Sequence, residues 1–405
     1  MSDTNTVAPE QPQYSKLRVG LMLGAVIMLL LIKGFGNYKF VPMQTLIMEF
    51  YNVGESAYGY LNTASGWVTT ICVIPFAFIV RKIRCNWSVI IGMGVAAAGI
   101  FVQSVAGSFA VLVIGRVIEG TGTGFANLVT AALILNLVDR RHVAFWSSMM
   151  TMVGVLPQII MAKGGTALIY NSGMHFQTLF RIIVFIYVGA IALWLILVPF
   201  SLRITGVGSS QKPTREQTIR VIKNKSNWLV ALANWFFTLA AITFTSYIIR
   251  YLTTVKGMEQ NQAANIYSYV TILGLFSMMA FGVISDKLHT KRKIAIMSYF
   301  AGAGALVLLA LIPASLIWIY IIYWGTLPRS IAPMGQASAT DVAELPADIP
   351  IVNSVKNVIN HVGTIVLGIL LGYSIQYLGY TTTIIFMAVG MAIGGVLWIF
   401  AKRIP

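Results

Sequence analysis

Charged side chains inside long apolar runs are the residues of this sequence best suited to do chemistry. Lys33, Arg116, Glu119, Arg329 and Lys356 all stand in mainly apolar surroundings. An ionised side chain in such a run costs at least about 2.5 kcal/mol to place in a membrane, and it usually faces a cavity, a partner or a pathway. Because four of these five groups are cations, we predict a positively charged cavity that attracts small carboxylates.

The two arginines of this set differ in whether an acid stands near them in the sequence. Arg116 and Glu119 are three residues apart, so they share a helix face and can form an ion pair. That pair either holds helices together or serves substrate or proton transfer. Glu119 is the only acid in the middle of an apolar run, and we predict that it carries a coupled proton. Arg329 has no acid at helical spacing, and its planar guanidinium suits two-point contact with a carboxylate. We predict that Arg329 binds substrate, with pairing to Glu119 or a backbone carbonyl as the alternative.

Polar residues at spacings of three and four add to this set. One run carries Asn353, Lys356, Asn357, Asn360, His361 and Thr364. Such a stripe is costly against lipid, so we expect it to line a pathway or pack on other polar helices. His361 is a second proton-coupling candidate, with a structural role as the alternative. For Lys33 the alternative is snorkelling to the outer surface. The predicted substrate-binding residues are Arg329, Arg116, Lys33, Asn357, His361, Asn127, Asn234, Tyr38 and Tyr247.

The elements that position these residues are membrane-spanning helices. The chain has 405 residues, of which 57% are hydrophobic and 10% charged, which excludes a water-soluble globule. About 20 residues suffice for a helix to cross the hydrocarbon core. Apolar blocks of that length predict twelve spans at 17–40, 56–80, 87–106, 109–136, 143–163, 180–202, 227–250, 263–284, 294–312, 315–337, 352–375 and 380–401.

The basic residues indicate the orientation of these spans. With the N-terminus inside, most lysines and arginines fall on inner segments, and the outer loops keep only a few, such as Lys39, Lys163, Arg250 and Lys256. This asymmetry satisfies the positive-inside rule and predicts cytoplasmic termini. The net charge of +16 is therefore mainly an anchoring feature, and no nucleic-acid partner is expected. We also expect no removable signal peptide.

The spans fall into two sets of six. The widest inner break, 203–226, is rich in Gly, Ser and basic residues and is predicted to be a solvated linker. The expected organisation is a first bundle at 1–202, the linker at 203–226 and a second bundle at 227–405. A shift of about 209 positions aligns tyrosines of the two halves, Tyr38 with Tyr247 among them. Such a repeat predicts a binding site near the bilayer midplane, between the halves.

Two motifs resemble those of the major facilitator superfamily. The stretch from Gly282 to Lys293 is similar to its G-x-L-x-D-R-x-G-R-R-R loop, and Arg116, Glu119, Gly120 and Gly122 resemble its R-x-x-Q/E-G-x-G pattern. The resemblance implies two pseudo-symmetric six-helix bundles and transport by alternating access. It also implies that Asp286 and Arg292 take part in an inner gate with Arg81, although the first-half copy of the loop lacks the aspartate.

Together these features predict a secondary transporter that takes up a small organic anion with protons. The alternatives are an exporter of drug-like or amphipathic compounds and a non-transporting membrane sensor. No enzyme motif, metal site or cofactor motif is present, and Cys72 and Cys85 lack zinc-ligand spacing. With no oligomerisation signal, a monomer is expected. The compact loops and the lack of targeting motifs favour the cytoplasmic membrane of a prokaryote.

Overall fold

A computed structural model describes residues 16–83, 85–137, 143–198, 214–288, 291–345 and 348–401. These residues form helices and short turns, with no strand among them. Nine of the helices in this part are long and apolar enough to cross a membrane. The expectation of an all-α membrane protein is therefore confirmed. The number of twelve spans and the cytoplasmic position of the termini stay predictions.

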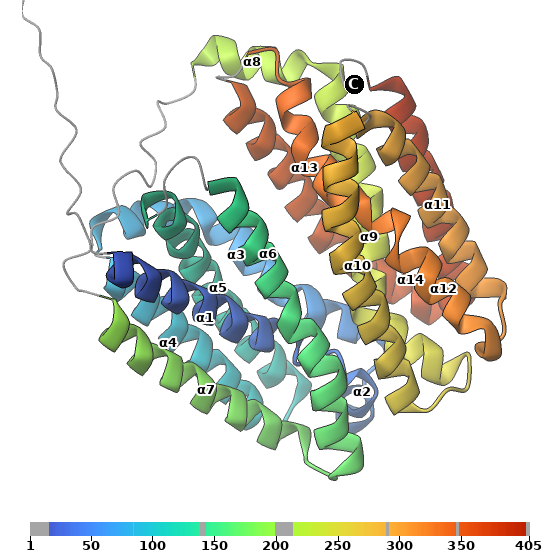
Figure 1. Ribbon diagram of the computed structural model, residues 1–405. Coiled ribbons are helices and arrows are strands. Elements are labelled where there is room, and N and C mark those ends of the chain that lie inside the picture. Colours follow the sequence, from blue (N-terminus) through green and yellow to red (C-terminus); the bar gives the residue numbers. More distant parts are fainter. Residues whose placement is uncertain are drawn as a thin grey trace, which may run out of the picture.

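The first half of the chain builds one bundle of helices (Figure 1). A π-helical segment continues α6, a local distortion that often occurs near functional sites. The elements are α1 (Lys16–Tyr38), α2 (Gln44–Tyr51), α3 (Glu55–Lys82), α4 (Cys85–Ser104), α5 (Phe109–Leu137), α6 (Val143–Ile160), η2 (Met161–Gly165), η3 (Ala167–Asn171) and α7 (Phe176–Leu197).

The second half builds the other bundle. Its elements are α8 (Arg215–Lys223), α9 (Lys225–Thr254), α10 (Gln260–Leu288), α11 (Lys291–Leu311), η4 (Ala314–Leu316), α12 (Ile317–Gly325), η5 (Leu327–Ser330), α13 (Ile331–Val342) and α14 (Ile349–Phe400). Gly379, with φ of 80°, bends α14 and separates the two predicted spans within it. Pro328 lies in η5, where it interrupts the predicted tenth span, because proline cannot donate the backbone hydrogen bond that a continuous helix needs.

Part of the predicted linker is helical. Helix α8 begins with a capping box in which Thr214 and Gln217 bond each other's backbone N–H groups. Arg220 of α8 donates two hydrogen bonds to Asp348 at the start of α14, at 2.7 and 2.8 Å. The guanidinium beside Asp348 holds the pKa of that carboxyl below its usual range. This contact attaches α8 of the predicted linker to the start of α14.

The two bundles meet at the end of the molecule that contains α2. In Figure 1 their helices approach one another near α2 and diverge toward α8. Hydrogen bonds between the two bundles gather in the half of the molecule that contains α2. These bonds join Glu55 to Arg250 and Tyr380, Thr45 to Arg250, Ser56 to Gln376, Tyr60 to Tyr373, Asn62 to Ser246, Gln158 to Tyr267, Pro42 to Gln260 and Asn171 to Asn261.

Glycines make this approach possible. A side chain at Gly372 of α14 would lie 2.8 Å from the carbonyl oxygen of Glu55. A side chain at Gly59 of α3 would lie 3.1 Å from the carbonyl oxygen of Gly368. Small residues let helix backbones come this close in a membrane. Helices α3 and α14 thus pack tightly at the α2 end of the molecule.

Candidate functional site

A cavity of about 310 Å³ lies between the two bundles, where α3 meets α9 and α14. Its volume is at the lower end of the range for small-molecule sites. Seven of its ten lining residues carry a hydroxyl or an amide, and none is charged. The lining residues are Asn62, Thr63, Ser65, Gly66, Thr238, Ala241, Ile242, Thr245, Ser246 and Thr364. Sequence analysis had selected only Thr364 from this set, as a member of a longer polar stripe.

The predicted polar stripe of α14 reaches this cavity through Thr364 and contacts α9 through Asn360. Asn360 accepts hydrogen bonds from Thr238 at 2.5 Å and from Asn234 at 3.3 Å. Asn357 and His361 have exposed side chains, and their spacing places them on the face of α14 that carries Thr364. Asn234 therefore contacts the stripe through Asn360, and the binding roles of Asn234, Asn357 and His361 stay predictions.

Arg329 lies in η5 against the aromatic ring of Phe244. The guanidinium carbon is 4.6 Å from the ring centroid, within reach of a cation–π interaction. Its Nε and Nη2 atoms are buried and have no hydrogen-bond partner in the described residues. The alternative in which Glu119 pairs Arg329 is wrong, because Glu119 is held by other cations. Arg329 is thus a buried cation with unused donors, which can bind an anion.

Tyrosines surround this arginine. Tyr38, Tyr267 and Tyr320 all lie within its electrostatic range. The ring of Tyr267 stacks on Phe244 with centroids 5.1 Å apart, and its hydroxyl accepts a hydrogen bond from Gln158 of the other bundle. Of the predicted tyrosines, Tyr38 therefore lies near Arg329. Tyr247 is buried and packs edge-on against Tyr58 at 6.0 Å, where the bundles meet.

The other predicted cations have partners. Lys33 is 5% exposed and donates a hydrogen bond to the side chain of Asn127. It does not snorkel to the outer surface, because that contact holds it between α1 and α5. Lys356 donates to the carbonyl oxygen of Gly335 at 2.6 Å and to Ser338 at 2.9 Å. The positive charge that the sequence assigned to one cavity is therefore divided among separate polar contacts.

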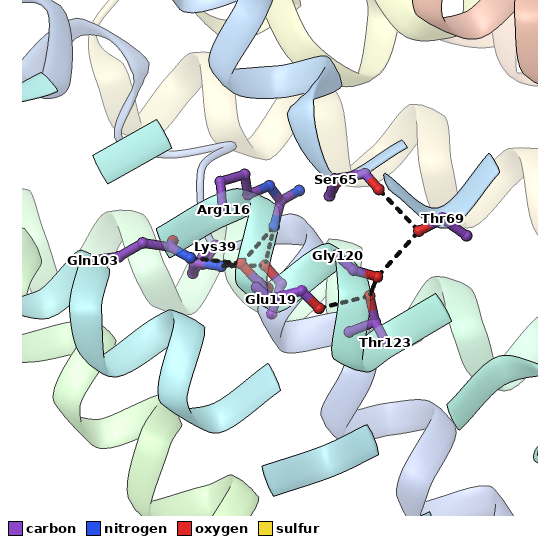
Figure 2. Close-up of polar contacts among 9 residues, drawn as sticks. Lys39, Ser65, Thr69, Gln103, Arg116, Glu119, Gly120 and Thr123 are labelled. Atoms are coloured by element: carbon purple, nitrogen blue, oxygen red, sulfur yellow. Dashed lines mark hydrogen bonds and ion pairs between the residues drawn. The ribbon is translucent and has the colours of Figure 1, made fainter. Parts of the chain in front are cut away.

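A buried ion cluster occupies the first bundle (Figure 2). One carboxylate oxygen of Glu119 accepts from Lys39 at 2.6 Å, from Arg116 at 2.9 Å and from Gln103 at 2.8 Å. Lys39 and Glu119 are both completely buried. The predicted ion pair of Arg116 and Glu119 is confirmed, whereas Lys39, which lies in the turn between α1 and α2, is buried in this cluster and is not an exposed loop residue. The position of Lys39 within the predicted span 17–40 was the signal that could have shown it to be a buried charge.

Gly36 of α1 allows this cluster to form. A side chain at Gly36 would lie 2.4 Å from the hydroxyl of Tyr187 and 2.7 Å from the free oxygen of Glu119. The carbonyl oxygen of Gly36 also accepts from Lys39 and Arg116. Nearby, Gly34 packs on Pro157 of α6 in the same way. These two glycines serve close packing, and α1 stays helical through Tyr38.

A second ion pair joins the two bundles and was missed by sequence analysis. Glu55 at the start of α3 accepts from Arg250 of α9 at 2.5 Å, from Tyr380 of α14 at 2.7 Å and from Gln44 at 2.9 Å. Both ionised groups stand at the edges of predicted spans, where a charge carries little information. We call Glu55, Arg250 and Tyr380 the inter-bundle triad.

The predicted inner gate is described only in part. The side chains of Asp286 and Arg81 lie outside the described residues. Arg292 donates to the carbonyl oxygens of Trp398 and Ile399 at the end of α14. Lys291 pairs with Asp341 at 3.1 Å. Each of these contacts lies within the second bundle, so the gating roles of Asp286, Arg292 and Arg81 stay predictions.

The chain was compared with known families and structures. The sequence model of the family Major Facilitator Superfamily matches residues 26–343 of this chain. A search of curated proteins finds no match. Among solved structures, a bacterial homolog to the human lysosomal transporter Spinster, inward-facing and unoccupied, is similar with a TM-score of 0.78 and 13% identity, over 96% of this chain and 98% of that one.

Two further solved structures share the fold. A POT family transporter in complex with a thioalcohol-conjugated peptide has a TM-score of 0.78 and 13% identity, over 94% of this chain and 96% of its own. The nucleoside transporter NupG has a TM-score of 0.73 and 11% identity, over 95% of this chain and 100% of its own. Identities this low establish a shared fold.

Proposed function

Since the chain belongs to the Major Facilitator Superfamily and has the fold of its transporters, we propose that it is a secondary active transporter that takes up a small organic anion with protons. The transporter class and the membrane location follow from the family and the fold. The anion, the coupling ion and the direction of transport are the proposal. The cytoplasmic membrane of a prokaryote and a monomeric state belong to it as well.

The observation that carries the proposal is the state of Arg329. Two of its guanidinium nitrogens are buried without an acceptor, and no carboxylate of the described residues pairs with it. A buried donor without a partner costs about 1–3 kcal/mol, and more when it is charged. A substrate carboxylate would accept from both nitrogens in the two-point geometry that arginine favours. Binding of a carboxylate would therefore remove the free-energy cost of the unsatisfied donors. This supports an anionic substrate.

The contacts between the bundles support alternating access. The inter-bundle triad and the close packing of Gly59 and Gly372 close the end that contains α2. With the positive-inside orientation, this is the outer end. Separation of the triad and rocking of the bundles would open the site to the outside, as expected for transporters built from repeats.

The two candidates for proton coupling have different surroundings. Glu119 is completely buried and compensated by Lys39 and Arg116, so its charge already stabilises the first bundle. His361 is exposed and lies three residues before Thr364, which lines the cavity. An exposed imidazole can exchange a proton with water. We therefore propose His361 for coupling and a structural role for Glu119.

The test is a thermal-shift screen with purified protein, followed by flux into liposomes. The probes are small carboxylates, phosphates, amines, neutral solutes and lipophilic drugs. A ligand at 100 times its Kd stabilises by about 2.7 kcal/mol. We expect a carboxylate to raise the melting temperature, and Arg329→Ala to abolish the shift. Arg215→Ala, which removes the same group from the exposed surface of α8, is the control.

The result can contradict the proposal in two ways. Shifts only with lipophilic cations or neutral aromatics, unchanged in Arg329→Ala, would refute the anion and favour an exporter. Binding of a carboxylate without flux in liposomes would favour a sensor. In either case the family and the fold stand.

A further inference from the structure

The cavity lining offers hydrogen-bond acceptors to a ligand. Thr63 and Thr364 each donate their hydroxyl proton to the carbonyl oxygen four residues earlier, at 2.9 Å, and the proton of Thr238 is engaged between the carbonyl oxygen of Asn234 at 2.9 Å and the side-chain oxygen of Asn360 at 2.5 Å. A hydroxyl that has donated its proton can still accept, because two lone pairs remain. A ligand at these three positions must therefore supply the donors.

Asn62 has the same character. Its amide nitrogen donates to the hydroxyl of Ser246, which is also a lining residue, at 2.5 Å. Among the described residues no donor bonds the amide oxygen of Asn62, so it is a further acceptor. The cavity is thus lined from both bundles by oxygens that match O–H or N–H groups.

The charge of the cavity lining indicates whether the ligand supplies charged N–H groups or neutral O–H groups. An ammonium group would need a carboxylate nearby, because an uncompensated ion inside a membrane protein is costly. None of the ten lining residues is acidic. Neutral hydroxyl groups satisfy the same acceptors without this cost. The cavity therefore favours a hydroxylated ligand over an amine.

Arg329 lies close to this lining. Thr245 lines the cavity. Phe244, the next residue to Thr245, carries the guanidinium on its ring. The ring of Phe244 thus lies between the acceptor-lined cavity and the unpaired cation, and one small molecule contacts both where this ring turns aside.

We propose that the substrate is a small hydroxylated carboxylate. Its carboxylate binds Arg329, and its hydroxyl groups donate to Asn62, Thr238 and Thr364. The inference rests on the proposed anion transport and deepens it, because it assigns the second recognition element of the same substrate. Each neutral hydrogen bond of this kind contributes modestly, so discrimination depends on several of them.

The test uses pairs of acids that differ only in hydroxyl groups. Gluconate is compared with hexanoate, glycerate with propionate, and sorbitol and glycerol are the neutral probes. Binding is measured by calorimetry and thermal shift on the whole protein. We expect the hydroxylated acid of a pair to bind at least 10-fold more tightly than its partner. Thr238→Val and Thr364→Val should each lower the affinity for the hydroxylated acid by roughly 2- to 10-fold. The affinity for the acid without hydroxyl groups should stay unchanged.

Thr243→Val is the matched control. Thr243 lies on the same helix and bonds its own i−4 carbonyl at 3.0 Å, but it points into the second bundle, where its hydroxyl also contacts Met387. This variant should bind every probe like the parent protein. An unchanged melting temperature of the two cavity variants without ligand shows that they fold.

The outcomes separate this inference from the proposed function. Equal binding of both acids in each pair, or no effect of the two cavity variants, overturns the hydroxyl sites and leaves anion transport standing. Binding of sorbitol or glycerol with no binding of any carboxylate overturns both. Failure of every hydroxylated acid to bind, while a plain carboxylate binds through Arg329, also overturns the inference alone.

Discussion

Replacement of Glu119 by Gln tests the buried ion cluster. The amide keeps the shape of the side chain but removes the charge that compensates two cations. Lys39 and Arg116 contact the same carboxylate oxygen at 2.6 and 2.9 Å, and at 0% and 4% exposure neither reaches water. Removal of one partner from a buried ion pair costs about 3–5 kcal/mol, because the remaining charge is left uncompensated. We expect Glu119→Gln to lower the free energy of unfolding by about this amount.

Equilibrium unfolding in mixed micelles, followed by circular dichroism, measures this change. Glu49→Gln is the control, because it makes the same replacement on an exposed side chain and should change stability by less than about 0.5 kcal/mol. Lys39→Met combined with Glu119→Gln restores the net charge of the cluster to that of the parent. The double variant should therefore be more stable than Glu119→Gln, a coupling that only contacting residues show. A fully stable Glu119→Gln protein that has lost only its proton coupling would refute the structural role.

The remaining predictions concern contacts between elements. Glu55→Gln should weaken the bond to Arg250 and shift the protein toward the state that is open at the α2 end, which modification of a cysteine introduced near that end would measure. Gly372→Ala should disturb the same packing, because the new methyl group would lie 2.8 Å from the carbonyl oxygen of Glu55, and a fall in melting temperature would show it. Because hydrogen bonds from Arg220 lower the pKa of Asp348, this contact stabilises the fold above the ordinary aspartate pKa of about 3.9 and loses that effect as pH falls through the lower folded value. The stability difference between the parent and Asp348→Asn should therefore shrink on acidification, and a difference that does not depend on pH would contradict this assignment.

Much of the fold was predictable because it depends on local patterns. Apolar blocks of membrane length fall on the observed helices, since a run of about 20 apolar residues suits a helix in lipid whatever its neighbours are. The pairing of Arg116 with Glu119 follows from a spacing of three residues. The lack of an acidic partner for Arg329 was also visible, because no acid stands near it in the sequence. The spacing of Asn357 and His361 placed them on one face for the same reason.

The contacts that decide the site are not local. Lys39 and Glu119 are 80 residues apart, and Glu55 and Arg250 are 195 apart. Which charges meet at these separations depends on how the helices pack and on glycines that let backbones approach, and neither follows from periodicity. The sequence by itself determined the helices, their faces and the residues whose charge must be satisfied. Only the tertiary structure decided which partner satisfies each charge, since that choice depends on distances between helices, and it left Arg329 with donors free to bind a substrate.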